Sequence, residues 1–143
     1  MEIYDLAPDS PARLANLSTR GYVGSGDSVL IGGMVIAGDG HSGTTPIMVR
    51  GRGRSMAEYV PDRIADPKVQ LYSNTIQMLE VDDWAGSWTA NRFRDGGTHE
   101  SYRPQNPFEA VFHHNLSPGA YTVILSGSQG SVGNGIIELY INQ

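Results

Sequence analysis

The sequence contains no cysteine, which excludes disulfide bonds and any metal site built on thiolates. A chain of 143 residues is nevertheless long enough to bury a hydrophobic core without covalent cross-links. Cysteine-free chains occur both in the cytoplasm and among bacterial surface proteins, so this absence does not choose a compartment. The length of the chain fits one ordinary domain, and without cysteine that domain is held together by packing and hydrogen bonds.

Charge is also scarce. Only 17% of the residues are Asp, Glu, Lys or Arg, and the formal net charge is −5. A general nucleic-acid binder needs a basic surface to displace counterions from phosphate. We therefore expect no nucleic-acid partner.

Long apolar runs are missing too. No stretch is long and apolar enough to cross a bilayer, so we expect no membrane insertion. Residues 1–10 have neither the basic start nor the apolar segment of a signal peptide. If the protein is secreted, its signal is expected to lie outside this sequence.

Helical periodicity is almost absent, and short apolar runs alternate with clusters of turn-forming residues, among them 18 Gly and 8 Pro. This pattern predicts an all-β fold, a two-sheet antiparallel β-sandwich of the Ig-like or jelly-roll-like kind with about eight or nine strands. The expected strands are 2–6, 13–19, 28–36, 45–51, 69–72, 76–81, 108–114, 120–126 and 135–142.

Several of these segments carry more specific predictions. Residues 28–36 are apolar on both faces, which predicts a central strand covered on two sides. Residues 21–27 are expected to form the turn before it, and residues 56–60 one helical turn. Ser73, Asn74 and Thr75 are expected at the tip of a hairpin.

No catalytic motif is recognisable, and we expect that the protein is not an enzyme. His99-Glu100 begins like a zinc-protease motif, but Arg103 stands where the second histidine belongs. His113 and His114 are adjacent on an expected strand and so point to opposite faces. No serine sits in the sharp strand-to-helix turn that a hydrolase nucleophile requires.

Asp82 and Asp83 open a long polar segment, residues 82–106, and supply the hard oxygen ligands that Ca²⁺ prefers. A calcium site at these two residues is therefore one hypothesis, and calcium is the one cofactor considered. The alternative is a turn in which the aspartates accept hydrogen bonds from backbone N–H groups.

Aromatic residues gather in the same segment. Trp88 and Tyr102 could stack on a glycan, whereas Trp84 is expected to tuck under the segment as a small satellite core. The predicted ligand-binding loop consists of four residues, Asp82, Asp83, Trp88 and Tyr102. Three arginines, Arg50, Arg52 and Arg54, could bind an anionic glycan or phosphate, although such residues more often neutralise nearby carboxylates.

Residues 13–36 carry a more specific signal in the runs RLANLSTRG, VGSGD and VLIGGMVI. They resemble a module of large secreted and surface proteins of environmental bacteria, whose pattern runs RLxNLSTRGxVGTGDxVLIGGFVI. The similarity continues through residues 48–51, 65–67, 71–72, 82–84, 116–122, 126–127 and 138–140. The second half also resembles pre-peptidase C-terminal domains, with an Asp-rich turn and a Pro-Gly-x-Tyr strand.

The resemblance implies a non-catalytic β-sandwich located outside the cell or on its surface, often in tandem copies. The sequence departs from the pattern in two places. Gly53-Arg54-Ser55 stands where Gly-Pro-Ser is usual, and the segment 82–106 lacks an Ala-rich stretch.

A repeated strand sequence suggests how such copies would associate. Glu2, Ile3, Tyr4, Asp5 and Leu6 near the start resemble residues 138–142 near the end. We therefore expect two parts, residues 1–11 as a strand and connector and residues 12–143 as the sandwich. The first part is expected either to join a sheet of a neighbouring copy, giving a filament or array, or to be the first strand of its own sandwich. A glycan- or calcium-binding accessory module is the alternative function.

Overall fold

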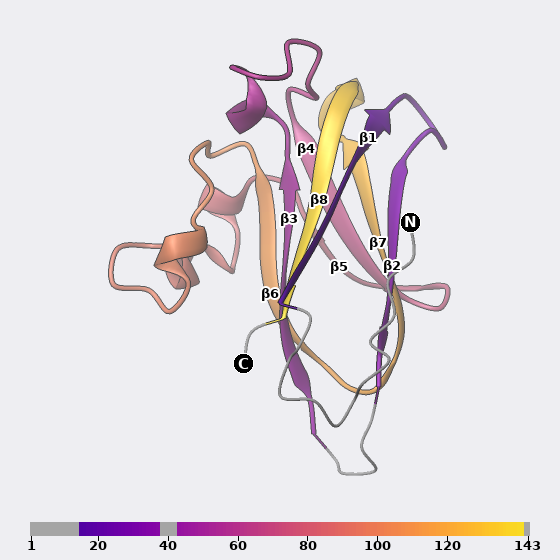
Figure 1. Ribbon diagram of the computed structural model, residues 1–143, viewed down its shortest axis with the longest axis vertical. Coiled ribbons are helices and arrows are strands. Elements are labelled where there is room, and N and C mark those ends of the chain that lie inside the picture. Colours follow the sequence, from indigo (N-terminus) through magenta and orange to yellow (C-terminus); the bar gives the residue numbers. More distant parts are fainter. Residues whose placement is uncertain (1–14, 38–42, 142–143) are drawn as a thin grey trace.

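The computed structural model describes residues 15–37 and 43–141, which form eight strands in two antiparallel sheets. Sheet A has the order β1-β8-β3-β6, and sheet B has the order β2-β7-β4-β5 (Figure 1). The strands are β1 (Asn16–Val23), β2 (Leu30–Ile36), β3 (Thr45–Arg52), β4 (Pro67–Ser73), β5 (Ile76–Val81), β6 (Ala110–Leu116), β7 (Gly119–Gly127) and β8 (Gly133–Ile141). The predicted two-sheet antiparallel sandwich is confirmed.

The two sheets face each other strand for strand. Contacts across the interior join β1 to β2, β8 to β7, β3 to β4, and β6 to β5. The strands β1 and β2 therefore lie at the same open side of the sandwich, and each is the edge of its own sheet.

The main core is built from alternate residues of the strands, as the period of two requires. Its fully buried members include Ile47 and Val49 of β3, Leu71 of β4 and Phe112 of β6. In the same sheet face, Gly51 must lack a side chain, because a Cβ there would lie 2.6 Å from Val69 Cγ1 and 2.7 Å from Leu125 Cδ1. The two sheets thus pack closely against each other at Gly51 of β3.

The hairpin between β4 and β5 is confirmed, and its tip contains Asn74 with φ of 53°. Asparagine tolerates this left-handed conformation better than most residues. The strand expected at 120–126 is present as β7, whose alternate residues Tyr121, Val123 and Leu125 are all buried in the core.

Two predictions are wrong. Residues 28–36 do not form a central strand, because β2 is the edge of sheet B and its outward side chains Ile31 and Val35 are 60% and 78% exposed. Apolar residues on both faces therefore do not indicate two covered faces here. The predicted turn 21–27 begins too early, since β1 continues to Val23.

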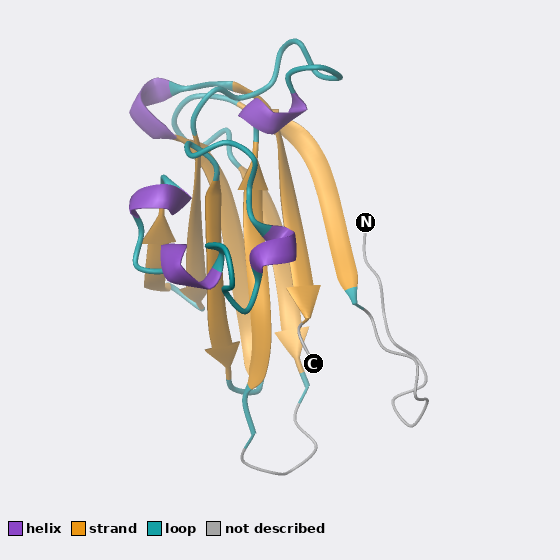
Figure 2. Ribbon diagram, turned by 90° about the vertical axis from the view of Figure 1, so that its left-hand side faces the viewer, coloured by secondary structure: helices purple, strands orange, loops and turns teal. Residues whose placement is uncertain are grey.

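The helical elements are single 3-10 turns of three residues: η1 (Arg54–Met56), η2 (Trp84–Gly86), η3 (Ala90–Arg92), η4 (Glu100–Tyr102) and η5 (Ser128–Gly130) (Figure 2). The expected helical turn at 56–60 is present, because the Val60 N–H donates to the Met56 carbonyl over 2.8 Å. None of the helices in the described residues is long and apolar enough to cross a membrane.

Residues 82–109 cover part of the outer face of sheet A, where η2, η3 and η4 lie (Figures 1 and 2). They form a second, smaller core with that face, made of buried Met48, Phe93 and Val111. Trp84, Tyr102 and Tyr140 pack against it. The predicted satellite core under Trp84 is therefore confirmed, and its indole N–H donates to the Asn106 carbonyl over 2.9 Å.

Candidate functional site: an acidic cluster and an open edge

The hairpin β4–β5 brings three aspartates together at one end. Asp66 directly precedes β4, and Asp82 and Asp83 directly follow β5. Because the strands are antiparallel, with Val69 opposite Val81, the start of one meets the end of the other. One carboxylate oxygen from each aspartate lies within 4.8 Å of the others.

The cluster is electrostatically unfavourable without a cation. Burial raises the pKa of Asp66, the charges of Asp82 and Asp83 raise it further, and Arg54 opposes the rise. Burial and the charge of Asp82 likewise raise the pKa of Asp83, again opposed by Arg54. Like charges this close disfavour the ionised form of each carboxyl group.

Two oxygens of the cluster lack hydrogen-bond partners. Asp66 Oδ1 and Asp82 Oδ1 are both buried and unpaired, while Asp82 Oδ2 accepts a hydrogen bond from Ser128 Oγ over 2.7 Å. Buried oxygens without donors are costly, and a hard cation would satisfy them. The arrangement can therefore supply an all-oxygen set of ligands.

The sequence hypothesis named two of these three residues. It missed Asp66, which is 16 residues from Asp82 in the chain; the available signal was the run Ala65-Asp66-Pro67 within the family resemblance. The alternative turn interpretation has no support at Asp83, which precedes η2 without a side-chain hydrogen bond to it.

The four residues of the predicted ligand-binding loop are not all in one place. Asp82 and Asp83 belong to the acidic cluster, and Trp88 is 61% exposed. The Tyr102 ring packs against Tyr140, with 5.1 Å between ring centroids. A hollow of mixed polar and apolar lining on the same segment is formed by other residues: Trp84, Glu100, Arg103, Pro104, Gln105 and Pro107.

The arginines at β3 mostly neutralise carboxylates, as expected. Glu138 of β8 lies on the outer face between Arg50, at 3.3 Å from Nε, and Arg52, at 3.1 Å from a guanidinium nitrogen. Arg54 instead stacks its guanidinium 4.4 Å from the centre of the Phe108 ring. Arg50 and Arg52 are thus engaged with the protein itself.

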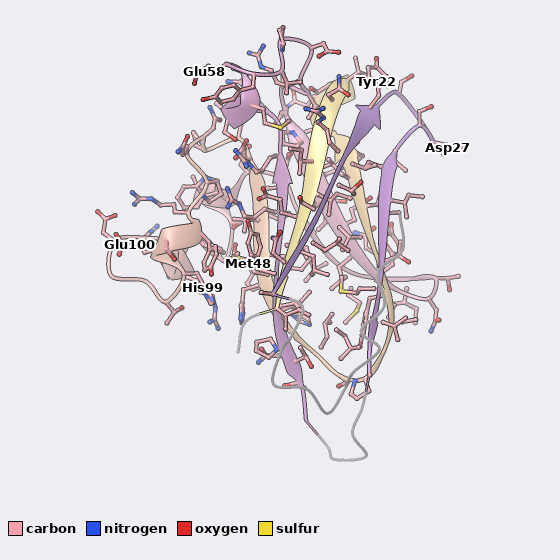
Figure 3. All side chains as sticks on the ribbon, viewed as in Figure 1. Tyr22, Asp27, Met48, Glu58, His99 and Glu100 are labelled. Atoms are coloured by element: carbon pink, nitrogen blue, oxygen red, sulfur yellow. The ribbon has the colours of Figure 1, made fainter. Side chains whose placement is uncertain are left out.

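Two histidines far apart in the sequence meet beside β6. His99, which Figure 3 labels on the covering segment, stacks on His113, a contact that the sequence did not reveal. Within the described chain, the three aspartates are the only group of three or more side chains placed to hold one metal ion.

The open side between β1 and β2 exposes residues that belong to the sandwich interior. Leu17, Met34 and Leu139 point inward but are only half-buried. They border a slot whose complete lining is Leu17, Thr19, Gly32, Gly33, Met34, Val123, Ile137 and Leu139. In Figure 1, β1 and β2 lie close together near the turn that joins them and diverge away from it. The slot is therefore an exposed part of the core.

The predicted assembly strand, Glu2, Ile3, Tyr4, Asp5 and Leu6, lies outside the described residues. Its sequence counterpart within the sandwich lies in β8, the second strand of sheet A.

Comparisons with known proteins add little. No family model matches the sequence, and no curated protein matches it. Among solved structures, it is similar to the pre-peptidase C-terminal domain of a collagenase from Bacillus anthracis. The identity is 11%, the match covers 90% of each chain, and the TM-score is 0.48.

Proposed function

We propose that this protein is a non-catalytic structural module of an extracellular or cell-surface assembly, and that copies of it join head to tail. Residues 2–6 of one copy would add as a strand to a sheet of the next copy. The observation that carries this proposal is the position of β8, whose sequence those residues resemble.

The β8 position is already filled within each domain. Leu139 points inward, Glu138 and Tyr140 lie on the outer face, and β8 pairs with β1 on one side and β3 on the other. A second segment with the same alternation, Glu2-Ile3-Tyr4, suits a strand with one buried and one exposed face. Since β8 leaves it no place, such a segment would need the free edge of a sheet.

Strand addition explains how copies would recognise one another. Main-chain hydrogen bonds supply the affinity, and the alternation of apolar side chains fixes the register. The donor segment and the acceptor edge are different surfaces, so each copy offers one of each. Contacts of this head-to-tail kind continue into open chains unless the rotation closes a ring.

Size-exclusion chromatography and electron microscopy of the full chain and of a deletion of residues 1–7 test the proposal. We expect concentration-dependent assemblies from the full chain and monomers from the deletion. The variant Ile3→Asp keeps the length and should also stay monomeric, whereas Glu2→Gln should assemble. Monomers from the intact chain at every concentration would contradict the proposal.

The acidic cluster favours a second candidate function, the binding of Ca²⁺ by Asp66, Asp82 and Asp83. Its specific support is the pair of buried carboxylate oxygens without donors. A cation that binds the native state must raise the melting temperature. Millimolar Ca²⁺ should therefore raise the melting temperature of the original chain but not that of the variant Asp82→Asn. Asp27→Asn is the control, because the exposed Asp27 lies elsewhere, and Ca²⁺ should stabilise it like the original chain. An unchanged melting temperature in all three argues against calcium.

The binding of a glycan stays a prediction. The hollow beside Trp84, with Glu100, Arg103 and Gln105, offers the mixed polar and aromatic lining that sugars bind. Calorimetric titration against a glycan panel checks it, with Arg103→Ala as the variant that should weaken any binding at the hollow.

A further inference from the structure

The interior of this sandwich is incomplete at one side. Residues on the inner face of a β-sandwich are normally buried by the opposite sheet. Here Leu17 of β1 and Met34 of β2 face each other across the open side and stay half-buried, with buried Val123 and Ile137 at the slot between them. One further strand along this side would bury Leu17 and Met34 as well.

We infer that the free edge of β2 is the acceptor, and that its occupant is residues 2–6 of a second copy of this chain. The inference rests on the proposed function and names the surface on which it acts. The slot between β1 and β2 would receive the inward side chain of the donor strand.

The edge of β2 is less protected against pairing than the edges of β1 and β5. Proteins block edge strands with charges, prolines and bulges. Arg20 lies in β1, and β5 carries Glu80 and a register shift opposite Leu71 and Tyr72. The seven residues of β2, LIGGMVI, contain no charge and no proline, and β2 pairs with β7 without a register shift.

The donor offers Ile3 to the inner face of this edge and Tyr4 with Leu6 to the outer face, while Asp5 shares the inner face with Ile3. If Ile3 points inward, as Leu139 does in β8, it enters the slot near Met34. Tyr4 and Leu6 then lie on the outer face of sheet B, beside Ile31 and Val35. Those two β2 side chains are the exposed apolar residues that made the strand look central in the sequence. One added strand would therefore cover both the slot and these side chains.

The connector favours a neighbouring copy over the chain's own β2. Pro8 and Pro11 stand between the donor and β1. Each fixes φ near an extended value and lacks an N–H group, so proline-containing connectors behave as stiff spacers. A stiff spacer would resist the chain reversal that residues 2–6 need to reach the β2 edge of the domain that follows them.

Disulfide trapping tests the inference cleanly, because the chain has no cysteine of its own. Tyr4→Cys in one copy is mixed with Val35→Cys in another copy of different length, and oxidised. We expect a disulfide-linked heterodimer on a non-reducing gel. Ile76→Cys is the matched control, since Ile76 is 70% exposed on β5 at the opposite edge of the same sheet. It should give no more than background cross-linking.

The outcomes separate the surface from the function. In one outcome the full chain assembles, but Tyr4→Cys forms its disulfide with Ser18→Cys of β1, or only with Ile76→Cys. The β2 acceptor is then wrong, and the proposed function stands. If a chain carrying both Tyr4→Cys and Val35→Cys closes only within itself, the donor belongs to its own domain and both proposals fall. If neither assembly nor trapping occurs, both also fall.

Discussion

The imidazole rings of His99 and His113 stack with 4.7 Å between their centroids and 28° between their planes. His113 lies on β6 and His99 on the segment that covers sheet A, so this contact joins the main sandwich to its cover. Burial lowers the pKa of His113 to about 4, with further lowering by Arg92, His99 and His114. Burial and Arg92 lower the pKa of His99 as well.

Acid should therefore loosen the fold at this stack. The folded pKa of His113 lies below its unfolded value of 6.5, so its contribution is present above pH 6.5 and is lost as the pH falls toward 4. Between about pH 7.5 and about pH 5, this one group should lower the free energy of unfolding by about 2 kcal/mol. Urea denaturation at the two pH values measures it.

The variant His113→Phe provides the control for this effect. It keeps a ring against His99 and removes the titrating group, so the same change of pH should destabilise it markedly less. An equal loss in the variant and the original chain would assign the pH dependence to other groups.

Phe93 should anchor the covering segment. It is fully buried with Met48 and Val111, and its ring meets Trp84 edge to face at 6.4 Å between centroids. Phe93→Ala should destabilise the protein by about 3 kcal/mol and expose residues 82–109 to proteolysis. Trp88→Ala, at an exposed site in the same segment, should stay within about 0.5 kcal/mol of the original. Equal effects of the two changes would contradict the second core.

Removing a charge from the acidic cluster should stabilise the protein when divalent cations are absent. Burial and the charge of Asp82 raise the pKa of Asp83, so ionised Asp83 opposes folding near neutral pH. Asp83→Asn should therefore melt at a higher temperature than the original chain in a chelator. This advantage should shrink as the pH falls toward the raised pKa, because Asp83 is then protonated in the folded original. A lower melting temperature in the chelator would show that the carboxylate has a stabilising partner.

The sequence predicts the sandwich well because its strands carry local signals. The hairpin at Asn74 and the alternation of Tyr121, Val123 and Leu125 can be read from short windows. It misplaces β2 for a physical reason: an apolar residue on a strand reports a preference for burial, not the burial itself. Ile31 and Val35 have the apolar side chains that prefer burial, yet both are exposed.

The candidate site was harder to predict because it depends on distant pairs. Asp66 meets Asp82 only through the β4–β5 pairing, and His99 meets His113 only because residues 82–109 fold over sheet A. Asp82 and Asp83 were accessible to sequence reasoning since they are adjacent and follow a recognisable strand. No spacing rule connects residues on separate elements before the topology is known.

A single charge on β2 should block assembly without disturbing the domain. Val35 is 78% exposed, so Val35→Lys should leave the melting temperature of the isolated domain nearly unchanged. In the assembly, however, Val35 would be covered by the donor, and lysine is a side chain with which natural edge strands prevent pairing. Loss of one buried valine contact alone, about 1.5 kcal/mol, raises the concentration needed for assembly roughly tenfold. Light scattering over a concentration series measures that shift. Ile76→Lys, the same kind of change on β5, should assemble like the original, and an equal defect in both variants would contradict a specific role for the β2 edge.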